Sequence, residues 1–284
     1  KMRKSLIVGK NGLIADRLSY LIDGMYSNNL SYEFTTSSIE VNNDSIFLDL
    51  ENPEKFNYSI LKHFSYVILL GGISSPDICQ NEPIKSKKIN FDGTKFFIHK
   101  CLKKGVKVLF FSTDLVYGES DSVMNELSNV NPKGNYAIWK YGIESAFKNH
   151  INFKVLRLSY VLSSNDKYVK YLKECKIKNS IAEVYDSFLR NVIYIDDLIL
   201  AIINLLKNWQ PEIKVVNVCG VKSISRFDIA KNLLHENSIN VIDAPKEFWE
   251  NRPKNIQVES LFLRKILQKN PTSFKEVIDK LKSS

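Results

Sequence analysis

Apolar and polar positions alternate along the first 160 residues in a pattern that predicts repeated strand and helix units. The short apolar runs that we expect to form strands lie at residues 5–8, 32–36, 45–48, 66–70, 106–111 and 154–158. The longer stretches with apolar residues at helical spacing lie at 15–26, 82–104 and 136–148. Because strands that alternate with amphipathic helices form βαβ units, the pattern predicts an α/β fold with a Rossmann-type, doubly wound parallel sheet.

The pattern is less regular after residue 160. Residues 192–206 read as a strand that enters a helix, and the strand-like run at 215–218 precedes Gly220 and a helix that begins near Ser225. We therefore expect a smaller α/β domain that is woven with the first one through a discontinuous boundary. The expected division is a dinucleotide-binding domain at 1–160 with part of 190–220, and a mainly substrate-binding domain at 161–284.

Composition narrows the class of protein. With 284 residues, of which 44% are apolar, the chain can bury a large core without covalent cross-links. The cysteines show neither a CxxC pair nor a matching histidine spacing, which argues against disulfides and against a zinc site; they are Cys79, Cys101, Cys175 and Cys219. We expect reduced cysteines that pack in the core, a cytoplasmic protein and no bound metal.

The net charge of +9 allows two interpretations, a surface for nucleic acid or a surplus that attracts anionic substrates. The lysine runs lack interleaved aromatic residues on which bases could stack, so we expect no nucleic-acid partner. The apolar run at the N-terminus is interrupted by Gly9 and Gly12 before it could serve as a signal peptide. No segment is long and apolar enough to cross a bilayer, so we expect no membrane association.

A glycine-rich turn follows the first predicted strand and opens a helix; it consists of Gly9, Lys10, Asn11, Gly12, Leu13, Ile14 and Ala15. Glycine at position 9 allows a tight turn, glycine at 12 lets the backbone approach a pyrophosphate, and the small Ala15 lets the helix pack closely on the strand. The unpaired N–H groups and the dipole of the helix start favour a phosphate. The turn predicts a dinucleotide site, and the alternative is a glycine-rich turn without a ligand.

The end of the second strand normally distinguishes NAD from NADP, because an acidic side chain there accepts the ribose 2′-hydroxyl. Here this region carries hydroxyl groups, on Thr35, Thr36, Ser37 and Ser38. With Lys10 close by, these groups suit a 2′-phosphate and favour NADP(H), while NAD(H) stays open. Glu33 is the objection, unless strand alternation places it inside. Asp49 and Leu50 follow the third strand and could hold an adenine edge, or Asp49 could cap a turn.

Three residues in the middle of the chain could carry proton-transfer chemistry. Tyr136 and Lys140 stand four residues apart in a predicted helix, so their side chains share one face and can address the same bound molecule. A nearby ammonium favours the phenolate, so we expect Lys140 to lower the pKa of Tyr136 toward working pH. Thr113, at the end of a strand, could hydrogen-bond the same substrate oxygen. Each feature alone occurs by chance, whereas their order along the chain is more specific.

The motifs follow one another at residues 9–12, 70–72, 76–79, 90–94, 112–118, 136–140, 157–161, 190–197, 217–220 and 252–253. In this order the chain resembles the extended short-chain dehydrogenase/reductases that act on nucleotide-sugars, over nearly its whole length. The resemblance implies that Tyr136 is the general acid/base, that Lys140 binds the nicotinamide ribose and tunes Tyr136, and that Thr113 orients the substrate oxygen.

The same resemblance implies further contacts and an oligomer. Besides the glycine-rich turn, it places the cofactor near Leu70, Gly71, Gly72, Asn90, Ser112, Tyr136, Lys140 and Ser159. It places the nucleotide-sugar substrate near Ser74, Thr113, Asp114, Arg190 and Arg252. The two arginines would hold the substrate diphosphate, for which a cationic fork is chemically apt. Members of the family are often dimers, so a homodimer stays open.

The residue that follows Thr113 and Asp114 separates the reactions of this family. Its 4,6-dehydratases carry Thr-Asp-Glu, because eliminating water needs an additional proton donor, whereas this chain has Leu115, which cannot move a proton. The chain is more similar to the dTDP-4-dehydrorhamnose reductases. This similarity implies an NADP(H)-dependent reductase of a nucleotide-linked 4-keto or 4-keto-6-deoxy sugar, in which C4 receives a hydride and Tyr136 donates the proton.

Two alternative functions stay open from the sequence. The first is a nucleotide-sugar C4 epimerase or dehydrogenase that holds NAD tightly, because the segment at 190–197 is more similar to the epimerases. The second is a cofactor-sensing regulatory protein without turnover. Proteins of that kind typically lose the Tyr/Lys pair, so its retention at Tyr136 and Lys140 weighs against this alternative.

Overall fold

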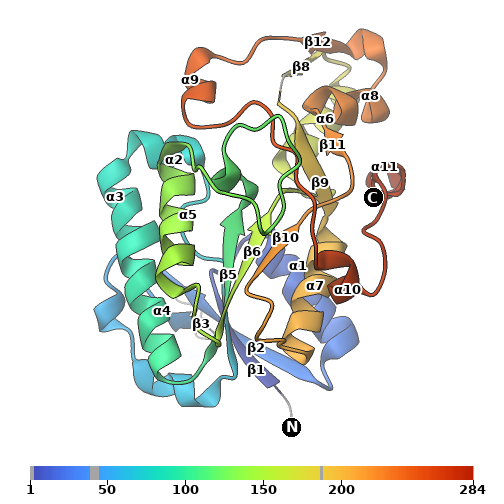
Figure 1. The fold of residues 1–284 in the computed structure, drawn as a ribbon. Coiled ribbons are helices and arrows are strands. Elements are labelled where there is room, and N and C mark those ends of the chain that lie inside the picture. The colour runs from blue at the N-terminus through green and yellow to red at the C-terminus, as the bar shows by residue number, and fades with distance from the viewer. Residues whose placement is uncertain (1–2, 39–44, 186–187, 284) are drawn as a thin grey trace.

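A computed structural model describes residues 3–38, 45–185 and 188–283 of the chain. Its main layer is a seven-stranded sheet in the order β10-β6-β5-β4-β1-β2-β3, and every neighbouring pair in it is parallel (Figure 1). The strands are β1 (Arg3–Val8), β2 (Leu30–Thr36), β3 (Ser45–Phe47), β4 (Tyr66–Leu69), β5 (Lys107–Thr113), β6 (Phe153–Leu158) and β10 (Val215–Val218). The predicted α/β fold with a Rossmann-type parallel sheet is confirmed.

Helices cover both faces of this sheet, as a doubly wound fold requires. Successive residues of a strand point to opposite faces, so Ile7 joins the core beneath one helix layer while Leu6 and Val8 join the other. One layer is made of α1 (Leu13–Leu21), α7 (Ile195–Lys207) and α10 (Leu263–Leu267). The other side carries α2 (Pro76–Asn81), α3 (Pro83–Lys87), α4 (Thr94–Lys103) and α5 (Gly134–Phe147).

Two predicted helices are divided by wider, π-helical turns. Residues 15–26 form α1 and a π-helical turn at Ile22–Tyr26, and residues 82–104 form α3, a π-helical turn at Lys88–Gly93 and α4. The second turn has a packing reason. It turns the buried Asn90 inward and brings Gly93 so close to the Leu50 carbonyl that a Cβ there would lie 1.7 Å from the oxygen. A regular helical pattern in the sequence does not reveal such a close approach.

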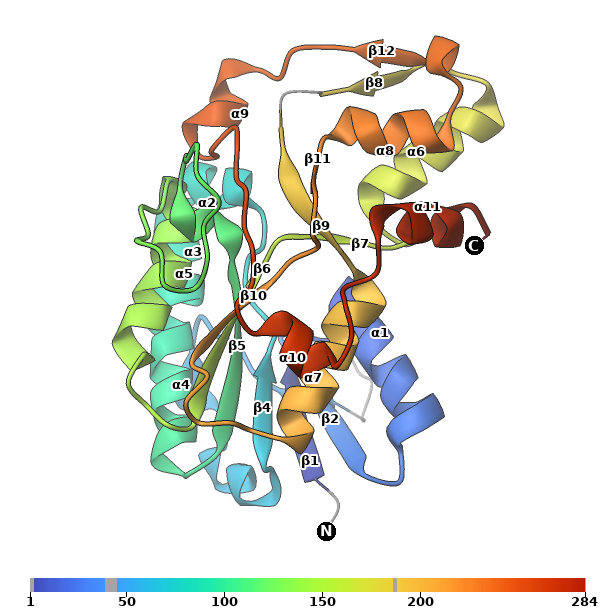
Figure 2. The same ribbon diagram turned by 45° about the vertical axis from the view of Figure 1, so that its right-hand side comes forward.

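A smaller layer lies beyond one edge of the main sheet, at the top of Figure 2. Its strands are β7 (Tyr160–Leu162), β8 (Ala182–Val184), β9 (Arg190–Tyr194), β11 (Ser223–Ile224) and β12 (Ile239–Val241). Its helices are α6 (Lys167–Lys178), α8 (Arg226–Leu233), α9 (Lys246–Glu250) and α11 (Phe274–Ser283). The chain returns to the main sheet through α7 and β10 before it completes this layer, an arrangement that supports the discontinuous domain boundary we propose.

Two features confirm local predictions in the second half of the chain. Ser225 caps α8 and forms a capping box with Asp228, which agrees with a helix that begins near Ser225. The strand that enters a helix at 192–206 is the β9 and α7 pair. Within the described ranges, no helix is both long and apolar enough to cross a membrane.

Candidate active site

A cavity of about 1410 Å³ opens where the strands of the main sheet end and the smaller layer begins. The loops after β1, β5 and β6 contribute to it, because the carboxyl ends of parallel strands share one edge of the sheet. This edge includes the point where the chain changes direction, since β1 lies between β2 and β4. The predicted site residues that line the cavity are Asn11, Gly12, Leu13, Ser74, Ser112, Thr113, Tyr136, Ser159, Arg190 and Arg252.

The glycine-rich turn has the geometry that a dinucleotide phosphate needs. Gly9 has a φ of +101°, and a Cβ there would lie 3.0 Å from the backbone of Gly71. Gly12 is the N-cap of α1, where no side chain in the described ranges caps the helix and a Cβ would meet nothing within 4 Å. The first N–H groups of α1 therefore face an open part of the cavity, so this cradle fits a pyrophosphate.

The region expected to select the cofactor lies at the ends of β2 and β3. The Lys10 ammonium donates to the Ser45 hydroxyl at 3.1 Å, and the buried Thr35 hydroxyl accepts from the Gly9 N–H at 3.4 Å. Glu33 is partly exposed and forms an ion pair with Lys4. The suggestion that strand alternation buries Glu33 is therefore wrong. The Glu33 carboxylate is nevertheless paired with Lys4 of β1.

Several predicted cofactor residues lie outside the cavity lining, and two of them form hydrogen bonds that hold loops of the main layer. Asp49 accepts from the Glu51 N–H at 2.8 Å and from the Asn52 amide at 2.7 Å, so its carboxylate caps a turn. The Asn90 amide bridges the Ile73 N–H and carbonyl, at 2.8 Å each, and holds the loop after β4. The predicted residues outside the cavity lining are Gly9, Lys10, Ile14, Thr35, Thr36, Asp49, Leu50, Leu70, Gly71, Gly72, Asn90, Asp114 and Lys140.

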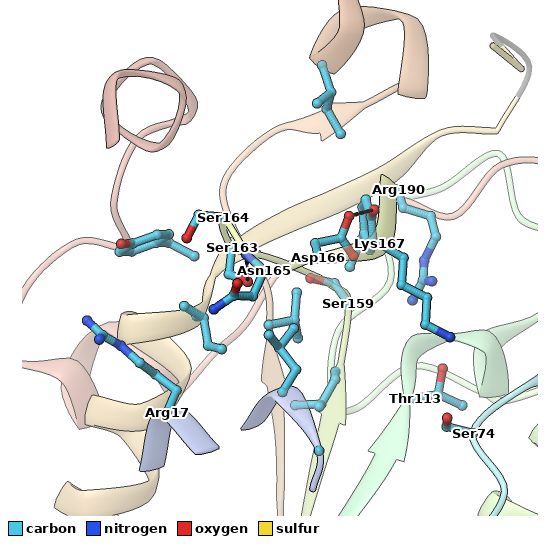
Figure 3. Close-up of a pocket in the computed structure, with 18 of the residues that line it drawn as sticks. Arg17, Ser74, Thr113, Ser159, Ser163, Ser164, Asn165, Asp166, Lys167 and Arg190 are labelled. Atoms are coloured by element: carbon cyan, nitrogen blue, oxygen red, sulfur yellow. Dashed lines mark hydrogen bonds between the residues drawn. The ribbon is translucent and has the colours of Figure 1, made fainter. Parts of the chain in front are cut away.

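The predicted catalytic residues come from β5 and α5. Tyr136 lies in the first turn of α5 and lines the cavity together with Thr113, the last residue of β5. Figure 3 places the hydroxyls of Thr113 and Ser74 on the same side of the cavity. Lys140 follows one turn after Tyr136, and its ammonium donates to the Phe111 carbonyl at 2.7 Å and lies 5.7 Å from the centre of the Tyr136 ring. Thr113 and Tyr136 thus line the cavity together, and Lys140 lies next to Tyr136 outside the cavity lining.

Burial shifts the pKa values of Tyr136 and Lys140. Burial raises the pKa of Tyr136 above its ordinary value, and the positive charge of Arg190 opposes that rise. Burial also lowers the pKa of Lys140 to about 8. The expectation that the pKa of Tyr136 is lowered is therefore wrong for this structure, because the effect of burial outweighs that of the nearby positive charge. Tyr136 carries its proton at neutral pH.

Both predicted substrate arginines are already ion-paired. Arg190, from the start of β9, donates through Nε to Asp114 Oδ2 at 3.2 Å and through Nη2 to Asp114 Oδ1. Arg252 donates from Nη1 and Nη2 to the two carboxylate oxygens of Asp77, at 2.6 and 2.7 Å. The Arg252 pair lowers the pKa of Asp77. Each arginine thus ties a late segment of the chain to the main layer, and the prediction that they hold a diphosphate stays a prediction.

A buried network lies beneath the site. Arg157 of β6 is paired with Glu144 of α5, with 2.6 Å between Nη2 and Oε2. Glu144 also accepts from the Ser112 hydroxyl, and Arg157 donates to the Tyr117 hydroxyl at 2.9 Å. The network fixes the helix of Tyr136 to the strands below it. Sequence reasoning missed Glu144, although a charged residue among the apolar positions of a helix is a signal for a buried partner.

Other cavity residues were missed because they lie in the irregular half of the chain. They come from the start of α6, the start of α8 and the segment before β9, and they include Ser163, Asn165, Asp166, Lys167, Lys170, Phe188 and Arg226, with Arg17 from α1. The high net charge is the one sequence signal that points to them. No group of three histidine, cysteine, aspartate or glutamate side chains in the described ranges could hold a metal ion.

Comparison with known proteins places the chain in a family. Residues 2–281 match the family model described as the RmlD substrate binding domain. The chain belongs to this family. No curated protein sequence matches it. Membership confirms the resemblance that the motifs imply.

Solved structures related to this RmlD-family chain share its fold over almost its whole length. The dTDP-4-dehydrorhamnose reductase of Bacillus anthracis in complex with NADP is 19% identical, with a TM-score of 0.80 and 99% of each chain covered. MoeE5 in complex with UDP-glucuronic acid and NAD is 17% identical, with a TM-score of 0.80 and coverage of 98% of this chain and 97% of MoeE5. UDP-glucose 4-epimerase of Thermotoga maritima with UDP-glucose is 18% identical, with a TM-score of 0.79 and coverage of 99% and 97%. At these identities the likeness establishes a shared fold.

Proposed function

We propose that this protein is an NADP(H)-dependent reductase of a nucleotide-linked 4-keto-6-deoxy sugar. The observation that carries the proposal is a single cavity that joins the glycine-rich turn to Thr113 and to a protonated Tyr136. One end of this cavity offers N–H groups to a pyrophosphate, and the other offers hydroxyls to a carbonyl oxygen. A cofactor and a ketone can therefore meet in it.

The residues of the cofactor half suit NADPH. Gly9, Gly12 and the first turn of α1 would hold the pyrophosphate, and Lys10 with Thr36 would face a ribose 2′-phosphate. Lys140 would hold the nicotinamide ribose. When bound, the nicotinamide supplies the hydride that C4 of the sugar accepts.

The residues of the substrate half complete the reduction. The Thr113 hydroxyl orients the C4 carbonyl, and the Tyr136 hydroxyl transfers its proton to that oxygen as C4 is reduced. The Tyr136 hydroxyl carries its proton at neutral pH, which is the state that ketone reduction needs, because the new hydroxyl of the sugar takes up a proton.

Leu115 supports reduction over dehydration. It is buried and lines the cavity two residues after Thr113. Elimination of water needs an acid at this end of the site, and the leucine side chain cannot supply a proton. The site thus holds the groups for ketone reduction and lacks that one group for dehydration.

The direct test follows the oxidation of NADPH with a panel of nucleotide-linked 4-keto-6-deoxy sugars. We expect turnover with at least one of them, together with free exchange of the cofactor during purification. Failure with all of them, combined with NAD retained on the purified protein and interconversion of simple nucleotide-hexoses, would replace the proposal by a C4 epimerase.

A further inference from the structure

Arg190 and Arg252, the two arginines expected to bind the substrate diphosphate, each form an ion pair with an aspartate of the protein. The guanidinium of Arg190 is held by Asp114, whose side chain is only 2% exposed, and that of Arg252 is held by Asp77 through two hydrogen bonds. Each pair adds no net charge to the cavity wall. A diphosphate therefore needs cations whose charge is not already offset.

Three such cations line the same cavity. Lys167, Lys170 and Arg226 all belong to its wall, and none of them forms an ion pair with another residue of the described ranges. Lys167 is the first residue of α6. In Figure 3 its side chain extends into the cavity, with the ammonium on the side of Thr113 and Ser74. Its charge is thus presented where a sugar nucleotide would lie.

Arg226 is held in place by aromatic rings instead of a carboxylate. Its guanidinium carbon lies 5.3 Å from the ring centre of Tyr168 and 5.9 Å from that of Tyr185. The Tyr168 hydroxyl also donates to the Arg226 carbonyl at 2.8 Å, which links the start of α6 to the start of α8. Stacking fixes a planar guanidinium and leaves its N–H donors available to an anion.

One carboxylate of the described residues, that of Asp166, lies beside these cations on the cavity wall and offsets one of their three charges. Asp166 is the N-cap of α6, and it accepts from the backbone N–H groups of Tyr168 and Val169, at 2.9 and 3.1 Å. It also accepts from the Tyr160 hydroxyl at 2.8 Å. Asp16, the other carboxylate of the cavity wall, lies in the first turn of α1, in the cofactor half. Among the described residues, three cations and one carboxylate lie on this part of the wall, so it carries a surplus of positive charge.

We propose that Lys167 and Arg226, assisted by Lys170, supply the uncompensated positive charge that binds the diphosphate of the nucleotide-sugar. This inference rests on the proposed function for the identity of the ligand. It assigns the affinity for the substrate to residues from the starts of α6 and α8.

The test measures binding to the NADPH-saturated protein without turnover, with dTDP and UDP as probes. We expect Lys167→Met and Arg226→Met each to weaken binding of the tighter probe by about tenfold or more, the loss of a charge-assisted contact. Lys176→Met is the matched control, because this exposed lysine lies on the same helix outside the cavity, and its effect should stay within about twofold. Thermal unfolding of each variant confirms that it is folded.

Three outcomes would overturn the inference. The first is binding of dTDP and UDP to both variants as tightly as to the wild type, and the second is no binding of either probe to the wild type. The third is a Lys167→Met variant that loses affinity for UDP-glucuronic acid but not for UDP, which would assign Lys167 to a sugar carboxylate. If the expected losses occur but no 4-keto sugar is reduced, the inference stands and only the proposed reaction fails.

Discussion

The Tyr136 hydroxyl is the group on which the proposed chemistry depends. Replacing Tyr136 by phenylalanine removes one oxygen and keeps the ring that lines the cavity. We expect turnover of the reactive 4-keto sugar to fall by about 10²–10⁴-fold, the range of general acid catalysis, because C4 reduction then lacks its proton donor. The dissociation constant of NADPH should stay within about twofold in a fluorescence titration. Turnover that survives this change would assign the proton to another group.

Lys140 should set the alkaline limit of activity. Its pKa is lowered from 10.5 to about 8, so its ammonium loses a proton as pH rises through about 8, while Tyr136, with its raised pKa, stays protonated. We expect kcat/KM for NADPH to decline above that pH. In Lys140→Arg the guanidinium stays charged, so the decline should move to higher pH in the measured profile. An alkaline limit at the same pH in both proteins would contradict this assignment.

At the scale of elements, the start of α1 is where we propose that the cofactor pyrophosphate binds. A Cβ on Gly12 would touch nothing within 4 Å, so Gly12→Ala should leave the free energy of unfolding within about 1 kcal/mol of the wild type. The methyl group would nevertheless stand where a pyrophosphate approaches, and we expect NADPH binding to weaken by about tenfold. Gly24→Ala is the matched control, since Gly24 has the same free space but lies outside the cavity. Equal affinities of the two variants for NADPH would argue against a pyrophosphate site at the start of α1.

The pair of Asp114 and Arg190 joins the loop after β5 to the start of β9. Removing one partner of a buried pair leaves an uncompensated charge, so Asp114→Asn should lower the free energy of unfolding by about 3 kcal/mol. The exposed pair of Asp92 and Lys87 provides the control, and Asp92→Asn should cost less than about 1 kcal/mol. Urea unfolding measures both. Similar losses in the two variants would mean that the buried pair does not join the layers.

At the scale of the whole molecule, the cofactor should stabilise the fold by mass action. NADPH at about 100 times its dissociation constant should raise the free energy of unfolding by about 2.7 kcal/mol. NADH at the same concentration should raise it less, because it lacks the 2′-phosphate that Lys10 would meet. In Lys10→Met the two cofactors should stabilise the protein equally, as measured by thermal unfolding. A preference for NADPH that survives this variant would locate the selecting group elsewhere.

The sequence determined the features that depend on near neighbours in the chain. Alternating apolar runs predicted the strands of the main sheet, because a parallel sheet covered on both faces needs apolar strands between amphipathic helices. Gly9 indicated a tight turn after the first strand, since its positive φ and its close approach to Gly71 both favour glycine. Thr113, Tyr136 and Lys140 could be selected as catalytic candidates because their chemistry follows from residue type and spacing.

Tertiary structure decided what depends on residues far apart in the sequence. Asp77 and Arg252 are separated by 175 positions, and no local pattern pairs them. The same holds for Asp114 with Arg190, and for the wall that brings Lys167 close to the catalytic end of the cavity. Burial raised the pKa of Tyr136 where spacing alone indicated that Lys140 would lower it. The physical reason is that desolvation and charge compensation are set by every group packed around a side chain, and the fold alone brings those groups together.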